Sequence, residues 1–358
     1  MKKITVLGGG GTGLTMAADL TLKGHEVTLY EDSRYQGNLE DVRNAGGITM
    51  QGNAGSGFAR ISRLTTSLKE AVKGADIILV AMIATRHQEL ADNLGPLLEN
   101  GQTVCYSAGS CGTILLRKRI PDHVHVITGE MQGNLYPCRL TGRATVSSAL
   151  PYMTKKVAAY PARDTDALIA AMEDVYPCEP AKNVMEAAFN SPNLSIHLAG
   201  SLLNTCAIEK NPDFCLYNEG ISPAVLTCIE QVEAEKKLVM TAMEFDHVSH
   251  LGMMKKLSCY GQYPELDAFR MVSGPNAMNH RYIEEDASTG QALMISLAHT
   301  LGLRLPCMEA LVQLAGVINH KDYLSVGRTL SSLGWDGLTA NEINALLFDG
   351  EPAPGPVI

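Results

Sequence analysis

The chain has 358 residues, a formal net charge of −9 and 46% hydrophobic residues, which predicts a globular protein of two domains, because single cores rarely exceed ~250–300 residues. It contains no block of lysines and arginines and no apolar run near ~20 residues, so we expect it to bind neither nucleic acid nor membrane. The nine cysteines form no CxxC pair and no metal-ligand spacing, which predicts free thiols in a reducing cytoplasm and no bound metal.

The first half of the chain alternates strand-like and helix-like segments. Strands are expected at 4–7, 26–30, 76–82, 103–107 and 124–128, with helices such as 12–23 and 88–98 between them. Strands and helices that alternate at this spacing form a parallel sheet with right-handed crossovers. Residues 1–182 are therefore predicted to form an α/β Rossmann domain with a doubly wound parallel sheet. His87, just after one of these strands, is expected on a helix surface rather than near a cofactor.

A glycine-rich turn follows the first strand and opens the first helix. Gly8 allows a tight turn, Gly10 leaves room for a pyrophosphate, and Gly13 lets the helix pack closely on the strand. The pyrophosphate would lie at the helix N-terminus, where free N–H groups attract an anion. Glu31, at the end of the second strand, is placed to bind the adenosine ribose and favours NAD, whereas Arg34 could hold the 2′-phosphate of NADP. The alternative is a glycine-rich turn that binds nothing. The expected cofactor contacts are Gly8, Gly10, Gly11, Thr12, Gly13, Glu31, Arg34 and, at a later strand end, Ala81.

From about Ala181 the strand-like runs nearly vanish and long amphipathic helices replace them. Residues 183–350 are predicted to form an all-α domain, and 351–358, rich in proline, a disordered tail. Serines precede prolines at positions 191 and 222 and predict two helix starts. The second helix should run to about 243 with an exposed Glu233–Lys237 pair. Residues 288–291 fit a capping box that would open another helix, which ends near 302.

The helix after position 192 carries a stripe of polar residues. Asn193, His197, Ser201 and Asn204 follow one another at spacings of four, four and three, which places them on one face. Periodicity alone favours the simple interpretation that this face meets water. A second polar cluster covers 280–286, where an acid could either complement a helix dipole or orient a catalytic histidine. Spacing leaves both interpretations open.

Five segments together resemble the opine dehydrogenase family, which includes octopine dehydrogenase and N-(1-D-carboxyethyl)-L-norvaline dehydrogenase. They are GGGGTG at 8–13, NLSIHLAGSLLN at 193–204, YNEGISPAV at 217–225, RYIEEDASTG at 281–290 and GRTLSSLGWDGLT at 327–339. The second and fourth segments are specific to the family. The resemblance covers nearly the whole chain and implies a Rossmann domain, a helical domain and a site between them. It also implies reductive condensation of an amino acid with a 2-oxo acid, usually pyruvate, by NADH or NADPH.

By this resemblance His197 matches the catalytic histidine of the family and Asp286 the carboxylate that pairs with it. Arg281 matches an arginine that binds the 2-oxo acid, and Asn193 an asparagine near the substrate. Family members differ in oligomeric state, so a homodimer is allowed without being required. Two other functions stay open: a 2-oxo acid or ketopantoate-type reductase, and a non-catalytic protein that senses a dinucleotide. The identity of the amino acid is not readable from the sequence.

Overall fold

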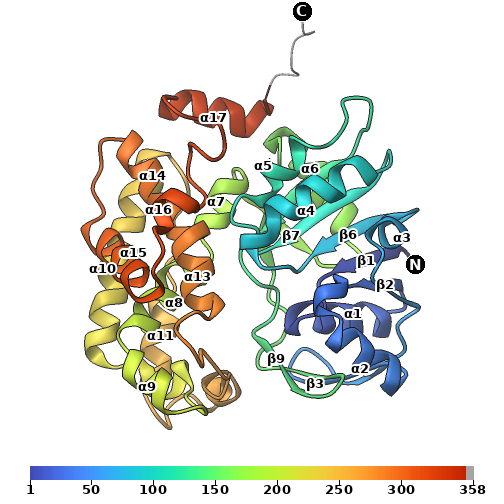
Figure 1. Ribbon diagram of the computed structural model, residues 1–358, viewed down its shortest axis with the longest axis horizontal. Coiled ribbons are helices and arrows are strands. Elements are labelled where there is room, and N and C mark those ends of the chain that lie inside the picture. The colour runs from blue at the N-terminus through green and yellow to red at the C-terminus, as the bar shows by residue number, and fades with distance from the viewer. Residues whose placement is uncertain (352–358) are drawn as a thin grey trace, which may run out of the picture.

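The computed structural model describes residues 1–351 and divides into an α/β part and a helical part that lie side by side (Figure 1). An eight-stranded sheet in the order β12-β11-β8-β7-β6-β1-β2-β5 forms the centre of the α/β part. Its strands are β1 (Lys3–Leu7), β2 (Glu26–Tyr30), β5 (Arg63–Thr65), β6 (Ile77–Val80), β7 (Thr103–Ser107), β8 (Ile127–Met131), β11 (Lys155–Ala159) and β12 (Cys178–Pro180). The central strands are buried on both faces, which explains why they read as continuous apolar runs.

The order of the strands places a ligand site at one edge of this sheet. The chain passes from β1 to β2 on one side of β1 and later returns to β6 on the other side of β1. All these pairings, and that of β6 with β7, are parallel. Ligands of doubly wound sheets bind outside the carboxyl ends of the strands at such a reversal. The predicted parallel Rossmann sheet is confirmed, with one exception, because β11 pairs antiparallel with β8.

A second sheet of four strands, in the order β4-β3-β10-β9, was not predicted. Its strands are β3 (Ile48–Gly52), β4 (Gly57–Ala59), β9 (Cys138–Gly142) and β10 (Thr145–Ser148). Helix α1 (Gly11–Leu22) lies between this sheet and the main one, so residues 13–20 are all buried (Figure 1). The remaining helices of the α/β part are α2 (Gly37–Ala45), α3 (Leu68–Val72), α4 (His87–Leu94), α5 (Gly112–Arg117) and α6 (Thr165–Met172), with short 3₁₀ turns η1 (Ser33–Tyr35), η2 (Ala84–Arg86), η3 (Gly95–Leu97) and η4 (Ala162–Asp164).

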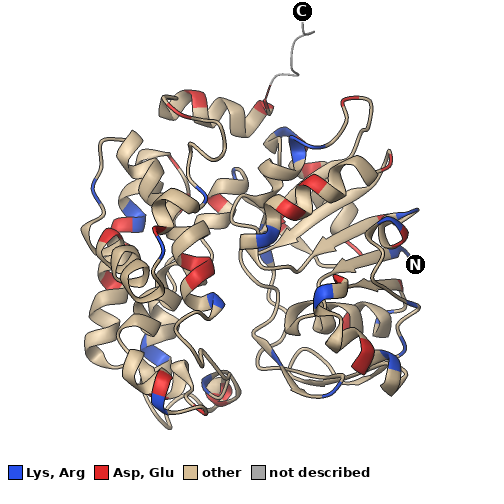
Figure 2. Ribbon diagram, in the orientation of Figure 1, with Lys and Arg blue, Asp and Glu red and all other residues tan. Residues whose placement is uncertain are grey.

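Every regular element from α7 onward is helical, as predicted. Helix α8 (Pro192–Leu202) packs against α10 (Pro223–Ala242), α13 (Arg281–Glu285) and α15 (Pro306–Asn319) at the centre of this part. Around them lie α7 (Val184–Phe189), α9 (Thr205–Lys210), α11 (Leu251–Leu257), α12 (Asp267–Arg270), α14 (Ala292–Thr300), α16 (Tyr323–Val326) and α17 (Ala340–Asp349), with η5 (Leu216–Gly220), η6 (Pro264–Leu266) and η7 (Asp286–Gln291). Helix α17 returns to pack on η4 of the α/β part (Figure 1). Figure 2 shows that acidic and basic residues are interspersed along the ribbon of both parts.

Several local predictions need correction. Ser222 caps α10 as expected, but Ser191 makes no capping hydrogen bond through its side chain. The predicted capping box is wrong, because α13, η7 and α14 follow one another without a break and the Ser288 hydroxyl donates to the Glu284 carbonyl four residues back, at 2.6 Å. Glu233 is buried, so it pairs with Lys236 and His247, each at 3.0 Å, instead of forming the predicted exposed pair.

One further prediction fails because of contacts between distant segments. His87 is fully buried, and its ring nitrogens lie 3.1 Å from the carbonyl oxygens of Met82 and Gly109, so it holds the turns after β6 and β7 together. Of the predicted tail, Glu351 is placed by a hydrogen bond from the Trp335 indole at 2.6 Å, and 352–358 lie outside the described residues. Within residues 1–351, no helix is long and apolar enough to cross a membrane, and all nine cysteines are free thiols.

Candidate active site between the two parts

The turn from β1 to α1 has the shape that a bound pyrophosphate requires. Gly8 has φ of +116°, a conformation that side chains disfavour. A Cβ atom on Gly13 would overlap the Gly8 carbonyl oxygen, so this glycine permits the close contact between helix and strand. A Cβ atom on Gly10 would meet nothing within 4 Å, and Gly10, Gly11 and Thr12 line an open cavity. The chain therefore provides an open cradle beside the N-terminus of α1, which fits the phosphates of a dinucleotide.

Glu31 also stabilises the glycine-rich turn, a role that the sequence does not reveal. It is buried at the end of β2, and its two carboxylate oxygens accept hydrogen bonds from the backbone N–H groups of Gly9 at 2.7 Å and Asp32 at 2.8 Å. The Asn38 side chain donates to the Gly9 carbonyl at 2.9 Å from the other side. These bonds hold the glycine turn in place. Each carboxylate oxygen keeps a second lone pair that could accept a ribose hydroxyl.

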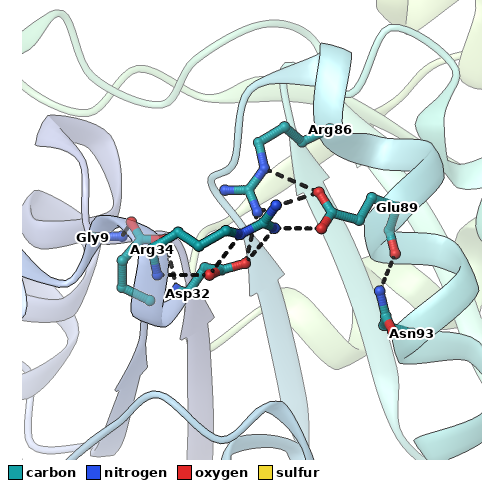
Figure 3. Close-up of polar contacts among 7 residues, drawn as sticks. Gly9, Asp32, Arg34, Arg86, Glu89 and Asn93 are labelled. Carbon is teal, nitrogen blue, oxygen red and sulfur yellow. Dashed lines mark hydrogen bonds and ion pairs between the residues drawn. The ribbon is translucent and has the colours of Figure 1, made fainter.

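Arg34 lies in a cluster of alternating charges outside the turn (Figure 3). Its exposed guanidinium contacts both Asp32 and Glu89. Arg86 pairs with the same two carboxylates, at 2.9 Å and 3.4 Å. Both guanidinium groups of this cluster are therefore already neutralised by carboxylates. A 2′-phosphate would have to compete with Asp32 and Glu89 for them.

A cavity of about 330 Å³ extends from the glycine turn to the helical part. Ala81, which follows β6, and Ala108, which follows β7, line it on one side, and Asn193, Arg281 and Asp286 line it on the other. Side chains that lie more than 200 positions apart in the sequence, such as those of Ala81 and Asp286, thus line one cavity. The carboxyl ends of the parallel strands form its floor, as the topology requires.

His197 lies in the middle of α8 with a partner at each ring nitrogen. Nδ1 is 2.8 Å from Asp286 Oδ2, and Nε2 is 3.1 Å from the hydroxyl of Tyr217. The ring stacks on Tyr282, with centroids 3.5 Å apart and planes inclined by 10°. His197 is 2% exposed, so the interpretation that this helix face meets water is wrong. Packing against α13 and η7 covers the face.

Burial and nearby charge set the protonation of this pair. Burial, with the positive charges of Arg281 and Arg139, lowers the pKa of His197 well below its ordinary value. Burial raises the pKa of Asp286 to about 7. The imidazole is therefore neutral at rest, because a charged ring in this place would be poorly solvated. A neutral ring that donates its Nδ1 proton to Asp286 presents a lone pair on Nε2.

Two guanidinium groups reach the cavity from opposite sides. Arg281, at the start of α13, lies 3.5 Å from Glu285. Arg139 comes from β9 of the α/β part, and its donors bind the Ser273 carbonyl at 2.9 Å, the Cys138 carbonyl at 2.9 Å and the Tyr282 hydroxyl. Arg139 thus spends three of its five donors on protein acceptors. Arg281 keeps more of its donors free for a ligand.

Four residues of this arrangement are missing from the sequence-based prediction: Arg139, Tyr217, Tyr282 and Glu285. Tyr217, Tyr282 and Glu285 lie inside the segments 217–225 and 281–290 that carry the family resemblance, so those segments were a usable signal. Glu285 accepts from the backbone N–H of Ala84 at 2.6 Å and so ties the two parts together. Arg139 lies in no motif, and only the tertiary structure places it here.

The predicted polar stripe divides into two halves, and its last member, Asn204, lies beyond the end of α8. Asn193 lines the cavity beside Arg281, and His197 lies one turn further along. Ser201 is buried with no hydrogen-bond partner for its hydroxyl among the described residues. Asn204 donates to the carbonyls of Gly200 at 2.8 Å and Gly220 at 3.0 Å, which is a structural role. Residues 1–351 contain no group of three or more His, Cys, Asp or Glu side chains that could hold a metal ion.

Two family models match the chain, one for each part. Ketopantoate reductase PanE/ApbA matches residues 4–129, and the model described as NAD/NADP octopine/nopaline dehydrogenase, alpha-helical domain, matches 180–319. Among solved structures, octopine dehydrogenase in complex with NADH and agmatine aligns with a TM-score of 0.71 at 16% identity, covering 99% of this chain and 100% of that one. Yersinopine dehydrogenase with bound NADP⁺ aligns with a TM-score of 0.64 at 15% identity, covering 98% of both chains. These structures establish the shared fold.

Curated relatives extend the match along the whole chain. Vitopine synthase of Allorhizobium ampelinum is 25% identical, covering 94% of this chain and 96% of that protein. Opine dehydrogenase of Arthrobacter sp. (strain 1C) is 30% identical, covering 96% of this chain and 98% of that protein. The protein therefore belongs to the opine dehydrogenase family, whose members are NAD(P)-dependent oxidoreductases that act on CH–NH bonds.

Proposed function

We propose that the protein condenses the amino group of an amino acid with a 2-oxo acid, pyruvate first among them, and reduces the product to a secondary amine with two carboxylates. The observation that carries this proposal is the pair of His197 and Asp286, 2.8 Å apart. This pair lies at a cavity system that also contains the glycine turn and two guanidinium groups. Solved complexes of octopine dehydrogenase with NADH and either L-arginine or pyruvate are consistent with it.

The reaction needs proton transfers that His197 is placed to make. The amine nitrogen adds to the carbonyl carbon of the oxo acid, and the adduct loses water to form an imine. His197 Nε2 accepts the proton that the amine gives up and returns it to the departing hydroxyl. Asp286 stabilises the imidazolium that exists between these transfers. The substrate nitrogen would take the place that the Tyr217 hydroxyl holds at Nε2.

Reduction of the imine completes the reaction. NAD(P)H, when bound, supplies the hydride to the imine carbon, and the nitrogen receives a proton, so that a C–H and an N–H bond form as NAD(P)⁺ is produced. Arg281 and Asn193 would orient the carboxylate of the 2-oxo acid, since a guanidinium can bind it with two parallel hydrogen bonds. Closure of the two parts would exclude water from the reacting atoms.

We further propose that NADH is preferred to NADPH. Glu31 repels a 2′-phosphate, and both nearby guanidinium groups are already paired with Asp32 and Glu89. The value of kcat/KM with NADH should exceed that with NADPH. A preference for NADPH would show that the cluster in Figure 3 opens to take the phosphate and would refute this part.

The test of the reaction is a spectrophotometric screen of NADH oxidation with pyruvate and each amino acid, followed by mass analysis of the product. Oxidation should require both substrates, and the product mass should equal their sum minus one oxygen atom. Oxidation with the 2-oxo acid alone would instead indicate a simple 2-oxo acid or ketopantoate-type reductase. NADH binding without turnover for any pair would indicate a protein that senses the dinucleotide.

A further inference from the structure

A second, smaller cavity of about 140 Å³ adjoins the first one on the side of His197. The two cavities share Asn193, Arg139 and Arg281 in their walls. His197, Tyr217 and Tyr282 line only the second cavity, so the reacting side of the imidazole faces it. Its other walls are largely apolar and include Met153, Met253, Met254, Phe269 and Val272. If the proposed function holds, this is where the amine substrate would lie.

Lys155 is the first residue of β11 and also lines this second cavity. Because β11 runs antiparallel to β8, its N-terminal end lies at the carboxyl edge of the parallel strands. That edge faces the active site. A parallel β11 would have placed Lys155 at the opposite edge of the sheet. The reversed strand therefore delivers a cation to the substrate cavity.

The Lys155 ammonium has no hydrogen-bond or ion-pair partner among residues 1–351. Desolvation lowers its pKa, and no carboxylate offsets that effect. The adjacent Lys156, by contrast, pairs with Asp246 at 3.0 Å. His250 lines the same cavity, and burial, together with the positive charges of Lys236 and Lys155, lowers its pKa. A partly buried cation without a counter-ion is costly, and a bound anion would offset that cost.

The charges around the cavity narrow the choice of ligand. None of the described residues that line it is acidic, and three of them, Arg139, Lys155 and Arg281, are basic. The product has at least two carboxylates, and Arg281 is assigned to the one from the 2-oxo acid. Arg139 is held by three protein acceptors. Lys155 is the cation that remains.

We propose, on the basis of the function given above, that Lys155 binds a carboxylate of the amine substrate, and that the cavity accepts neutral or acidic amino acids and rejects cationic ones. A guanidinium or ammonium on the amino-acid side chain would meet three like charges and no acidic partner. Neutral side chains would pack on the methionines, which adapt to different shapes. Lys155 thus determines substrate specificity without taking part in the proton transfers.

The test compares Lys155→Met and Lys155→Arg with the matched control Lys156→Met on the same strand. Methionine keeps most of the length and suits the apolar wall while removing the charge. K155M should raise KM for the amino acid roughly 10- to 100-fold, the usual range for loss of a charge-assisted hydrogen bond. In K155M, KM for pyruvate and the affinity for NADH should change less than about twofold. K155R should restore most of the affinity for the amino acid, and K156M should resemble the wild type.

Two substrate series identify which carboxylate is bound. If K155M raises KM for every α-amino acid but not for primary amines that lack a carboxylate, Lys155 binds the α-carboxylate. If K155M raises KM only for aspartate and glutamate, Lys155 binds a side-chain carboxylate. An unchanged KM for all amino acids in K155M, an equal loss in K156M, or a wild-type preference for arginine or lysine would overturn the proposal.

Calorimetric titration of the NADH-loaded protein with amino acids separates this proposal from the proposed reaction. Binding that weakens in K155M but not in K156M supports the role of Lys155 even when no turnover is seen. Turnover that is normal in both variants, with unchanged binding, supports the reaction and refutes the role of Lys155.

Discussion

Replacing Asp286 with asparagine removes a charge from the centre of the site at almost constant volume. In the wild type, Asp286 Oδ2 lies 2.8 Å from His197 Nδ1, and both side chains are buried. The asparagine oxygen can still accept the Nδ1 proton, so the ring can stay in place. What is lost is the stabilisation of the imidazolium that forms when His197 takes a proton from the substrate.

The size of the effect follows from this contact. A hydrogen bond to a charged group contributes roughly 1.5–3 kcal/mol, and each 1.36 kcal/mol corresponds to a factor of ten in rate. We therefore expect kcat to fall about 10- to 150-fold while the asparagine oxygen faces Nδ1. If the amide turns its NH₂ group to the ring, the wrong tautomer results, and the loss approaches ~10⁴-fold.

The pH dependence distinguishes this role from a structural one. Burial raises the pKa of Asp286 to about 7, so the carboxylate is charged only above that pH. The ratio of wild-type to D286N kcat should therefore rise as the pH increases through about 7. Steady-state kinetics across the pH range and NADH titration at each pH measure this, and the affinity for NADH should be unchanged. The matched control is Glu284→Gln in the preceding turn, which removes the half-buried carboxylate that pairs with Lys321. A kcat within twofold of the wild type, or a ratio independent of pH, would refute the reasoning.

Three further predictions concern the glycine turn, the oxo acid and a buried carboxylate. Gly13→Ala should lower Tm and abolish NADH binding, because the added Cβ overlaps the Gly8 carbonyl. Gly10→Ala should keep Tm and weaken only NADH binding, because its Cβ enters the open cradle. Equal Tm values for the two variants would contradict this reasoning. Arg281→Lys should raise KM for pyruvate roughly tenfold with a smaller change in kcat, since the two-pronged contact is lost; an unchanged KM rejects the assignment. Burial raises the pKa of Glu130 to about 7. The folded protein therefore keeps this carboxyl protonated where the unfolded chain ionises it, so the free energy of unfolding of the wild type falls as the pH rises from the ordinary glutamate pKa through about 7. Glu130→Gln should gain stability relative to the wild type over that interval, as measured by urea denaturation at each pH. A difference in unfolding free energy between the two proteins that stays constant with pH would show that Glu130 does not titrate in that interval.

Local patterns predicted much of this molecule from the sequence. The glycine spacing, the apolar strands and the change to helical periodicity near Ala181 each depend on residues within one or two elements. The segments that include His197 and Asp286 were sufficient to indicate that these two side chains belong together. Such features are readable because backbone conformation and side-chain period are set by near neighbours in the chain.

Other features depended on partners that lie far away in the sequence. The second sheet covers the face of α1 that the main sheet leaves free, the buried surroundings of 288–291 keep a helix continuous where a cap was expected, and His87 is buried by the turns after two strands. Arg139 and Lys155 reach the substrate cavity from β9 and β11, and no motif marks either of them. Burial, strand direction and the meeting of the two parts are set by packing across the whole chain. For this reason the sequence determined which chemistry the protein carries, whereas only the tertiary structure decided which charges surround the substrate.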